Sequence, residues 1–241
     1  MKIKEFKGSQ RCMIKLISSP DFLTHLNSII KDTDTTITNN DVWIPKGLND
    51  PRESQLKSFL KSNFGLEIYN GIVEWWMLVN VTTPTWDFVS TCNINGKKGI
   101  LLIEAKAHQT ELESSGKKLK KDASKISQKN HFKIGTAINE AKIGINETYN
   151  GVSISSEKCY QLSNRVAHAW WLANNGIPVV LLYLGFLDAE DMNYGRRVIF
   201  KSEKNWKDYF INHAQQVGVD GIVDQEIDCG RSSFKLIVRS I

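Results

Sequence analysis

Residues 84–107 read PTWDFVSTCNINGKKGILLIEAKA, and this stretch predicts a β-hairpin. The pattern of residues 86–94 indicates a strand. Asn95 and Gly96 follow it, and this dipeptide is the favoured one for a two-residue hairpin turn. Residues 99–107 then form the return strand, which opens with a continuous apolar run.

This hairpin would bring two carboxylates together. With residues 95–96 as the turn, an unbroken ladder places Asp87 directly opposite Glu104, with Cβ atoms about 4.5–5.5 Å apart. A β-bulge would shift this register. Since alternate residues of a strand share a face, Glu104 and Lys106 point to one side of the sheet and Ala105 to the other.

Two facing carboxylates repel each other, so something must offset their charge. A divalent cation does so, and oxygen ligands suit Mg²⁺ or Mn²⁺. Asp87, Glu104 and the carbonyl of Ala105 are the candidate ligands. Lys106 could orient or deprotonate an attacking water, or stabilise charge on a phosphate. The alternative is a surface hairpin with a Glu–Lys pair, but the apolar run favours a buried strand, where a free charge pair is costly.

The motif formed by residues 84–87 and residues 104–106 resembles that of the PD-(D/E)XK, or restriction-endonuclease-like, nuclease superfamily. Sixteen residues separate Asp87 from Glu104, which that motif tolerates. The resemblance covers roughly residues 51–187. It implies that Asp87 and Glu104 are metal ligands and that Lys106 is catalytic. The wider chain also resembles a group of uncharacterised bacterial proteins, which implies no function.

The family often adds an acidic residue from the helix before the hairpin. Glu53 and Glu74 are the candidates, and Glu53 is preferred because we expect it in the first turn of a helix. Pro51 suits the first position of that helix, with Asp50 as its cap. The alternative is that Glu53 only complements the helix dipole.

The family also often carries a polar residue on the helix after the hairpin. A helix is predicted over residues 157–174, where Gln161, Arg165 and His168 lie on one stripe. Gln161 could orient the water or a phosphate, and Arg165 could contact a phosphate oxygen. The alternative is a solvated polar face, which we favour for His168.

Residues 116–129 hold six lysines against one acid, Asp122. A basic segment this close to the motif would follow a phosphate backbone. The alternative is a flexible, solvated loop. The residues predicted to contact nucleic acid are Lys117, Lys118, Lys120, Lys121 and Arg165.

The remaining elements indicate an α/β fold of the restriction-endonuclease-like kind, a mixed β-sheet flanked by helices. Residues 51–241 would form this domain, with residues 1–50 as its N-terminal elaboration. Residues 179–186 are apolar on both faces, which favours an interior strand with parallel neighbours. The other predicted elements are a helix at 20–30, a loop at 31–40, a helix or strand at 68–81, helices after 130 and at 205–217, and strands near 221–227 and 234–241.

Composition agrees with one globular domain: 241 residues, 41% of them apolar. The net charge of +5 is compatible with nucleic-acid binding but does not establish it. The four cysteines lack the spacing of a zinc site or a disulfide framework, so we expect reduced thiols. Residues 1–17 lack the apolar core of a signal peptide, and no segment is long enough to span a membrane, which predicts a cytoplasmic protein. The seven tryptophans are expected in the core.

The sequence therefore predicts an Mg²⁺- or Mn²⁺-dependent nuclease that hydrolyses phosphodiester bonds, with DNA as the expected substrate and RNA left open. One alternative is a non-catalytic module that binds nucleic acid or protein on the same fold. Another is a metal-dependent hydrolase of a small phosphorylated substrate. Many restriction-like nucleases act as dimers, so a homodimer is a further expectation.

Overall fold

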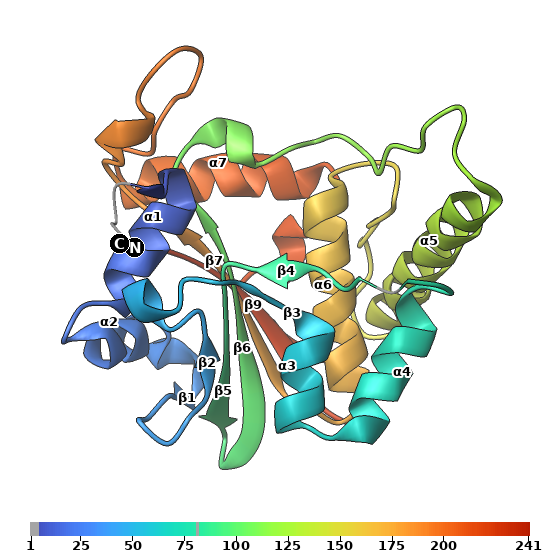
Figure 1. The fold of residues 1–241 in the computed structure, drawn as a ribbon. Helices are drawn as coiled ribbons and strands as arrows, with labels where there is room; N and C mark the ends of the chain where they lie inside the picture. The colour runs from blue at the N-terminus through green and yellow to red at the C-terminus, as the bar shows by residue number, and fades with distance from the viewer. Residues whose placement is uncertain (1–4, 81) are drawn as a thin grey trace.

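A curled, mixed β-sheet of seven strands forms the centre of the molecule (Figure 1). The computed structural model describes residues 5–80 and 82–241. The strand order is β1-β5-β6-β7-β9-β8, with β2 also paired to β5. The strands are β1 (Thr35–Thr36), β2 (Trp43–Ile44), β5 (Phe88–Ile94), β6 (Lys97–Lys106), β7 (Val179–Gly185), β8 (Glu226–Asp228) and β9 (Ser233–Ser240), and a separate two-stranded sheet joins β3 (Ser54–Gln55) to β4 (Thr85–Trp86).

The β5–β6 hairpin has the predicted register. Its ladder starts at Ile94 opposite Lys97 and runs without a bulge to Phe88 opposite Ile103. Asn95 and Gly96 form the turn with φ values of 50° and 79°, as a tight hairpin turn of this type requires. The ladder ends one residue short of Asp87, so the structure confirms the predicted register as far as Phe88 and places Asp87 next to it, without the direct Asp87–Glu104 pair that an unbroken ladder would give.

Strand β7 occupies the interior of the sheet, as its apolar sequence predicts. It pairs in parallel with β6 on one side and with β9 on the other, and all seven of its residues are buried. Parallel strands end at the same edge of a sheet. The last residues of β6, which carry Glu104 and Lys106, therefore lie at the edge where β7 and β9 also end.

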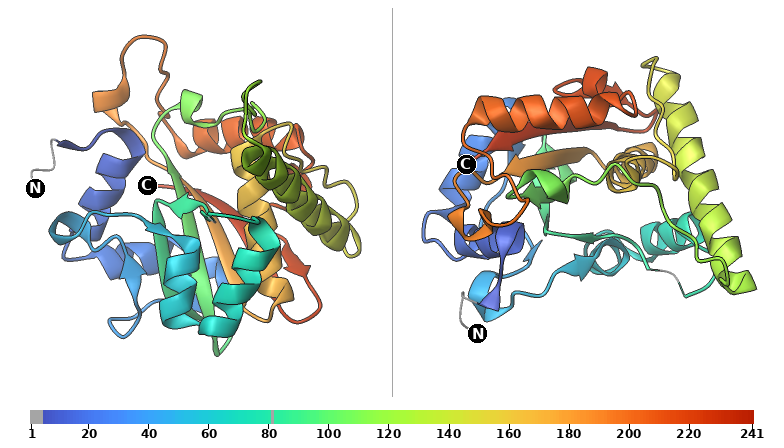
Figure 2. Two further views of the ribbon diagram at one scale, coloured as in Figure 1. Left: turned by 45° about the vertical axis from the view of Figure 1, so that its right-hand side comes forward. Right: turned by 90° about the horizontal axis from the view of Figure 1, so that it is seen from above.

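Helices cover both faces of the sheet (Figure 2). The first two helices pack with Ile103 and Ala105 in one apolar cluster, and the others pack on the opposite face in a second. The helices are α1 (Gly8–Ile17), α2 (Phe22–Ile29), α3 (Leu56–Asn63), α4 (Leu66–Trp76), α5 (Lys125–Asn146), α6 (Tyr160–Asn174) and α7 (Glu203–Gln215). Short 3₁₀ turns are η2 (Lys31–Thr33), η3 (Gly47–Asn49), η4 (Gln109–Glu111), η5 (Glu190–Met192) and η6 (Asp220–Ile222).

The helix expected to begin at Pro51 is the main local error. Helix α3 begins only at Leu56, because Ser54 and Gln55 are held in extended conformation by their pairing with β4. Asp50 does not cap this helix, and its carboxylate accepts hydrogen bonds from the Arg52 guanidinium instead. A local sequence pattern cannot show a strand pairing with a segment thirty residues away.

Other sequence expectations were met or resolved by the structure. The undecided stretch 68–81 belongs largely to helix α4, although Val81 lies outside the described residues. Of the seven tryptophans expected in the core, six are buried, and Trp43 is half-buried against the core. Helix α1 was not anticipated, and residues 31–40 contain strand β1 as well as loop. None of the helices in the described part of the chain is long and apolar enough to cross a membrane.

Candidate active site

Glu104 and Lys106 lie at the end of β6 in a buried cluster of charged side chains. Their side chains share the face opposite Ala105, as predicted. The Lys106 ammonium donates to Glu104 Oε1 at 2.7 Å, and Arg165 Nε of helix α6 donates to Glu104 Oε2 at 2.7 Å. Burial raises the pKa of Glu104, but the charges of Arg165 and Lys106 outweigh it and hold this pKa below its usual range. Glu104 therefore carries a negative charge between two cations, with only 3% of its surface exposed.

Asp87 completes the pair of carboxylates that the hairpin register predicts. Its Oδ2 atom accepts a hydrogen bond from the backbone N–H of Ala105 at 2.8 Å. Burial and the negative charge of Glu104 raise the pKa of Asp87 to about 8. This is the electrostatic cost expected for two neighbouring carboxylates, and the charge of Lys106 and the hydrogen bond from Ala105, which both lower this pKa, offset it only in part.

Gln161 and Arg165, one turn apart on helix α6, meet the hairpin from the other side of the site. Gln161 Oε1 accepts a hydrogen bond from Lys106 Nζ at 2.9 Å, so Lys106 is held between Glu104 and Gln161. The Arg165 guanidinium also donates to the carbonyl of Thr85 and lies 4.4 Å from the centre of the Trp86 ring. Gln161 therefore contacts the candidate catalytic lysine, whereas Arg165 is directed at Glu104 rather than at solvent.

Glu53 lies close enough for its charge to interact with this cluster, but in a different setting from the one expected. It precedes strand β3 rather than beginning a helix. Burial and the charge of Glu104 raise its pKa, and Gln10 of helix α1 donates a hydrogen bond to it at 3.3 Å. Within residues 5–80 and 82–241, no three His, Cys, Asp or Glu side chains are grouped closely enough to hold a metal ion.

The oxygen atoms at Asp87 and Glu104 nevertheless suit a hard divalent cation. A carboxylate offers about four lone-pair positions, and the two cations bonded to Glu104 take two of them. The carbonyl of Lys106 points toward β7, so strand alternation directs the carbonyl of Ala105 toward Asp87. Mg²⁺ commonly binds through one or two carboxylates and keeps several waters, so this incomplete set fits it without Glu53.

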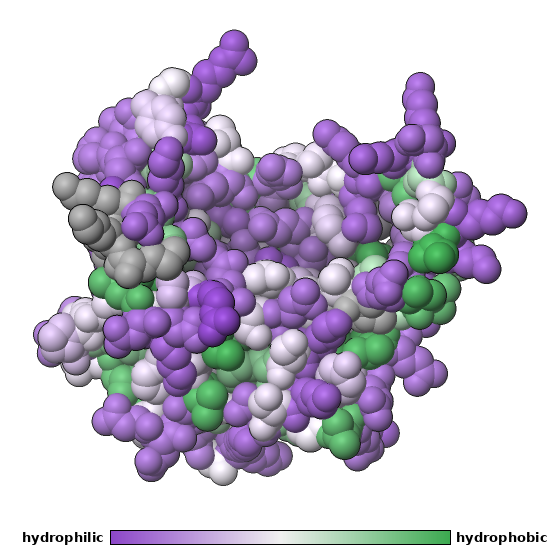
Figure 3. Space-filling view, in the orientation of Figure 1, coloured by the Kyte–Doolittle hydropathy of each residue, from purple (hydrophilic) through white to green (hydrophobic). Residues whose placement is uncertain are grey.

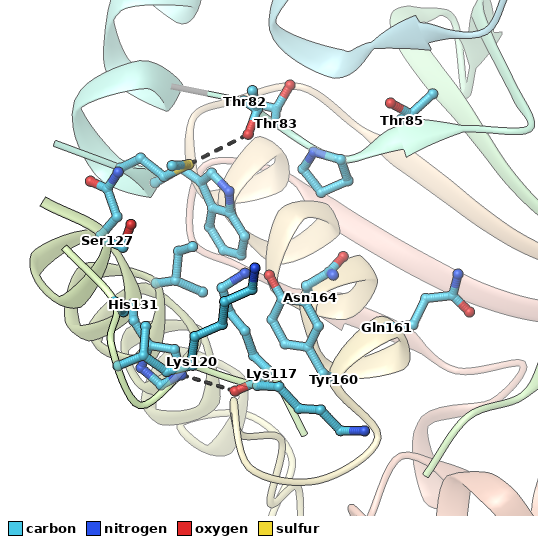
Figure 4. Close-up of a pocket in the computed structure, with 18 of the residues that line it drawn as sticks. Thr82, Thr83, Thr85, Lys117, Lys120, Ser127, His131, Tyr160, Gln161 and Asn164 are labelled. Carbon is cyan, nitrogen blue, oxygen red and sulfur yellow. Dashed lines mark hydrogen bonds between the residues drawn. The ribbon is translucent and has the colours of Figure 1, made fainter. Parts of the chain in front are cut away.

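A hydrophilic hollow opens at the same end of the molecule, between the loop after β7 and the segment before α5 (Figure 3). On the α5 side it contains a cavity of about 890 Å³. Gln161 and Arg165 line this cavity, and therefore connect it to Lys106 and Glu104. Figure 4 shows Lys117 and Lys120 of the basic segment in this cavity with Tyr160. Lys118 also lines the cavity, but Lys121 does not.

Two side chains near the site were not found by sequence reasoning. Tyr183 of β7 pairs with Glu104 across the sheet, and its buried hydroxyl has no hydrogen-bond partner among the described residues. His213 of α7 has its pKa lowered to about 4 by burial and by the positive charge of Lys106. Neither residue stands in a recognisable motif. Only the pairing of distant strands and the packing of α7 bring them to the hairpin.

His168 does not lie on the solvated face that we expected. It is fully buried and contacts the rings of Trp75 and Trp76, which are themselves adjacent, with centres 5.3 and 4.3 Å from its own. Burial lowers its pKa to about 3, so it stays neutral at physiological pH. His168, one turn beyond Arg165 on helix α6, therefore packs into the protein core and does not belong to the candidate active site.

No family model, curated protein or solved structure matches the chain. The residues of the site are therefore the only basis for assigning a function.

Proposed function

We propose that this chain is a metal-dependent nuclease that hydrolyses phosphodiester bonds, with DNA as the expected substrate, on a restriction-endonuclease-like fold. The proposal rests chiefly on Asp87. This carboxyl lies beside Glu104 with an elevated pKa, while Glu104 alone is neutralised by Lys106 and Arg165. A protein gains no stability from an uncompensated carboxyl in such a place, but a cation site requires one.

The order of elements supports the same fold. A hairpin carries the two carboxylates, and a crossover through α5 and α6 leads to β7, which is parallel to the second hairpin strand. The site lies at the carboxyl ends of parallel strands, where open α/β sheets usually bind ligands. These are the features that the sequence resemblance implies.

The residues of the site divide the chemical work between them. Asp87, Glu104 and the carbonyl of Ala105 would hold Mg²⁺ or Mn²⁺, which supplies charge neutralisation at the phosphoryl oxygens. Lys106, positioned by Gln161, would orient the attacking water and stabilise negative charge on the phosphate as the phosphorus–oxygen bond breaks. Arg165 keeps Glu104 ionised and in place. Glu53 would add negative charge near the metal site without being a required ligand.

A cleavage assay tests this proposal. Supercoiled, linear duplex and single-stranded DNA are incubated with the protein and Mg²⁺ or Mn²⁺, beside the variants Asp87→Asn, Lys106→Ala and, as a control, Lys97→Ala at the turn of the same hairpin. We expect cleavage by the wild type and by Lys97→Ala, and a loss of about 100-fold or more in the other two. Equal cleavage by all four proteins would place the activity elsewhere. Absence of both cleavage and calorimetric metal binding in the wild type would refute the proposal.

A hydrolase of small phosphorylated molecules is the second candidate. The observation in its favour is the cavity beside Gln161, whose volume of about 890 Å³ lies within the range of small-ligand pockets. Release of phosphate or alcohol from mononucleotides, without cleavage of any polynucleotide, would favour this candidate.

A further inference from the structure

We infer that the cavity beside the active site binds single-stranded nucleic acid, and that unpaired nucleotides are the substrate presented to Asp87, Glu104 and Lys106. This inference rests on the proposed nuclease function and names its substrate class. It starts from three properties of the cavity: its charge, its mixed lining and its connection to the site.

The charge of the cavity favours a polyanion. Lys117, Lys118 and Lys120 line it, while the acid that lines it is Asp122. Among the ion pairs of the described residues, none joins these three lysines to a carboxylate. Burial lowers the pKa of Lys117, which shows that this ammonium is partly removed from water without a compensating acid. A phosphate backbone would supply the missing negative charge.

The lining also offers surfaces that a phosphate chain alone would not need. Tyr160 begins helix α6 at the cavity, with the Lys117 ammonium 5.0 Å from the centre of its ring. The half-buried Met77 and the exposed Leu119 add apolar surface, and Ser127 adds a hydroxyl group. Nucleobases have an apolar face that stacks on aromatic rings and a polar edge that forms hydrogen bonds. The combination of aromatic, polar and cationic groups is that of single-strand binding sites.

The volume of the cavity favours unpaired bases over paired ones. A duplex exposes only the edges of its base pairs, in the grooves, so its bases cannot enter a cavity without leaving the stack. A volume of about 890 Å³ has room for unpaired nucleotides. Because Gln161 and Arg165 belong both to the cavity wall and to the bonds around Lys106 and Glu104, a strand held there would pass beside the carboxylates.

A binding experiment without metal tests this inference separately from cleavage. Fluorescence anisotropy in EDTA is used to compare a labelled single-stranded oligonucleotide, the same sequence as a duplex, and a strand of equal length whose central nucleotides lack bases; an unlabelled mononucleotide serves as competitor. We expect the intact single strand to bind at least about tenfold more tightly than the duplex or the abasic strand. The mononucleotide should compete only at much higher concentration.

Two double variants with equal loss of charge locate the binding site. Lys117→Ala with Lys120→Ala should weaken single-strand binding at least about tenfold and reduce its salt dependence by a slope of about 1.4. Lys31→Ala with Lys97→Ala is the control, because both lysines are exposed. Lys97 lies at the turn of the hairpin, at the end of β6 opposite to the site. Circular dichroism and thermal melting would verify that both variants are folded.

Several outcomes would overturn the inference. They are tighter binding of the duplex, equal binding of the abasic strand, competition by the mononucleotide at oligonucleotide concentrations, and equal weakening by the two double variants. Strong single-strand binding without cleavage in Mg²⁺ or Mn²⁺ would instead refute the nuclease function and leave the cavity assignment standing. Equal cleavage of duplex DNA by the wild type and by Lys117→Ala with Lys120→Ala would support the nuclease function and refute the cavity as the substrate site.

Discussion

The two ends of the β5–β6 hairpin have similar charged side chains in opposite environments. At the turn, Lys97 and Lys98 are exposed, and the Lys98 ammonium donates to the carbonyl of Asn63 at 2.6 Å. At the other end, Glu104 and Lys106 expose only 3% and 4% of their surface. One strand thus carries solvated charges at its start and buried charges at its finish.

This difference separates charge that is solvated at little cost from charge that is buried at a cost in stability. Exposed lysines cost little, because water solvates them. Buried ion pairs seldom stabilise a protein relative to apolar residues, because the cost of removing them from water offsets their attraction. The far end of the hairpin therefore keeps its charges at a cost in stability, which supports the proposal that they have a function.

The largest expected change in the free energy of unfolding comes from Glu104→Gln, at the buried end of the hairpin. The variant removes the negative charge that Lys106 and Arg165 share, and leaves two buried cations without it. Loss of one partner of a buried ion pair costs about 3–5 kcal/mol. Urea unfolding at pH 7 should show this loss, whereas Lys97→Ala at the turn should change the free energy of unfolding by less than about 0.5 kcal/mol. Similar small changes in both variants would remove the distinction between the two ends.

Asp87, at the buried end of the hairpin, should make the stability of the protein depend on pH. In the unfolded chain Asp87 ionises near its ordinary pKa of 3.8, but in the folded protein it keeps its proton up to a pKa of about 8. Between these values the unfolded state binds fewer protons, so this group makes the folded state less stable as pH rises from about 4 to about 8. Asp87→Asn lacks this effect and should gain stability relative to wild type across that window, by on the order of a few kcal/mol.

Urea unfolding in EDTA, repeated from pH 4 to pH 9 for wild type and Asp87→Asn, measures this difference. Titrating groups far from Asp87 contribute equally to both proteins and cancel, whereas Glu104 and Glu53, whose charges interact with Asp87, contribute to the difference. Excess Mg²⁺ should stabilise the wild type more than the variant. A difference between the two proteins that does not change with pH would show that Asp87 ionises normally in the folded state.

The smallest expected effect lies at the turn. Gly96 has a φ of 79°, a left-handed value that side chains with a Cβ atom rarely adopt. Nothing contacts the position where a Cβ would stand, so Gly96→Ala costs only backbone strain, about 1–2 kcal/mol. Thermal melting should show this modest loss while metal binding at the other end is unchanged. Loss of metal binding as well would mean that the turn controls the register at Asp87.

The sequence by itself determined the hairpin, its register and the shared face of Glu104 and Lys106. These follow from local rules: a dipeptide that selects one turn type, and a side-chain period of two along each strand. It also determined that β7 lies inside the sheet, because a strand that is apolar on both faces has no side to present to water. Helical spacing together with a family resemblance made Gln161 a candidate, and its role remains a prediction.

Only the tertiary structure decided what surrounds this hairpin. The pairing of β3 with β4 set the start of helix α3 and the setting of Glu53, and the packing of α6 turned Arg165 toward Glu104 and buried His168. The packing of distant elements likewise brought Tyr183, His213 and the lysine-lined cavity to the site. The physical reason is that strand pairing and helix packing depend on contacts between residues far apart in the chain, and periodicity within one segment carries no information about them.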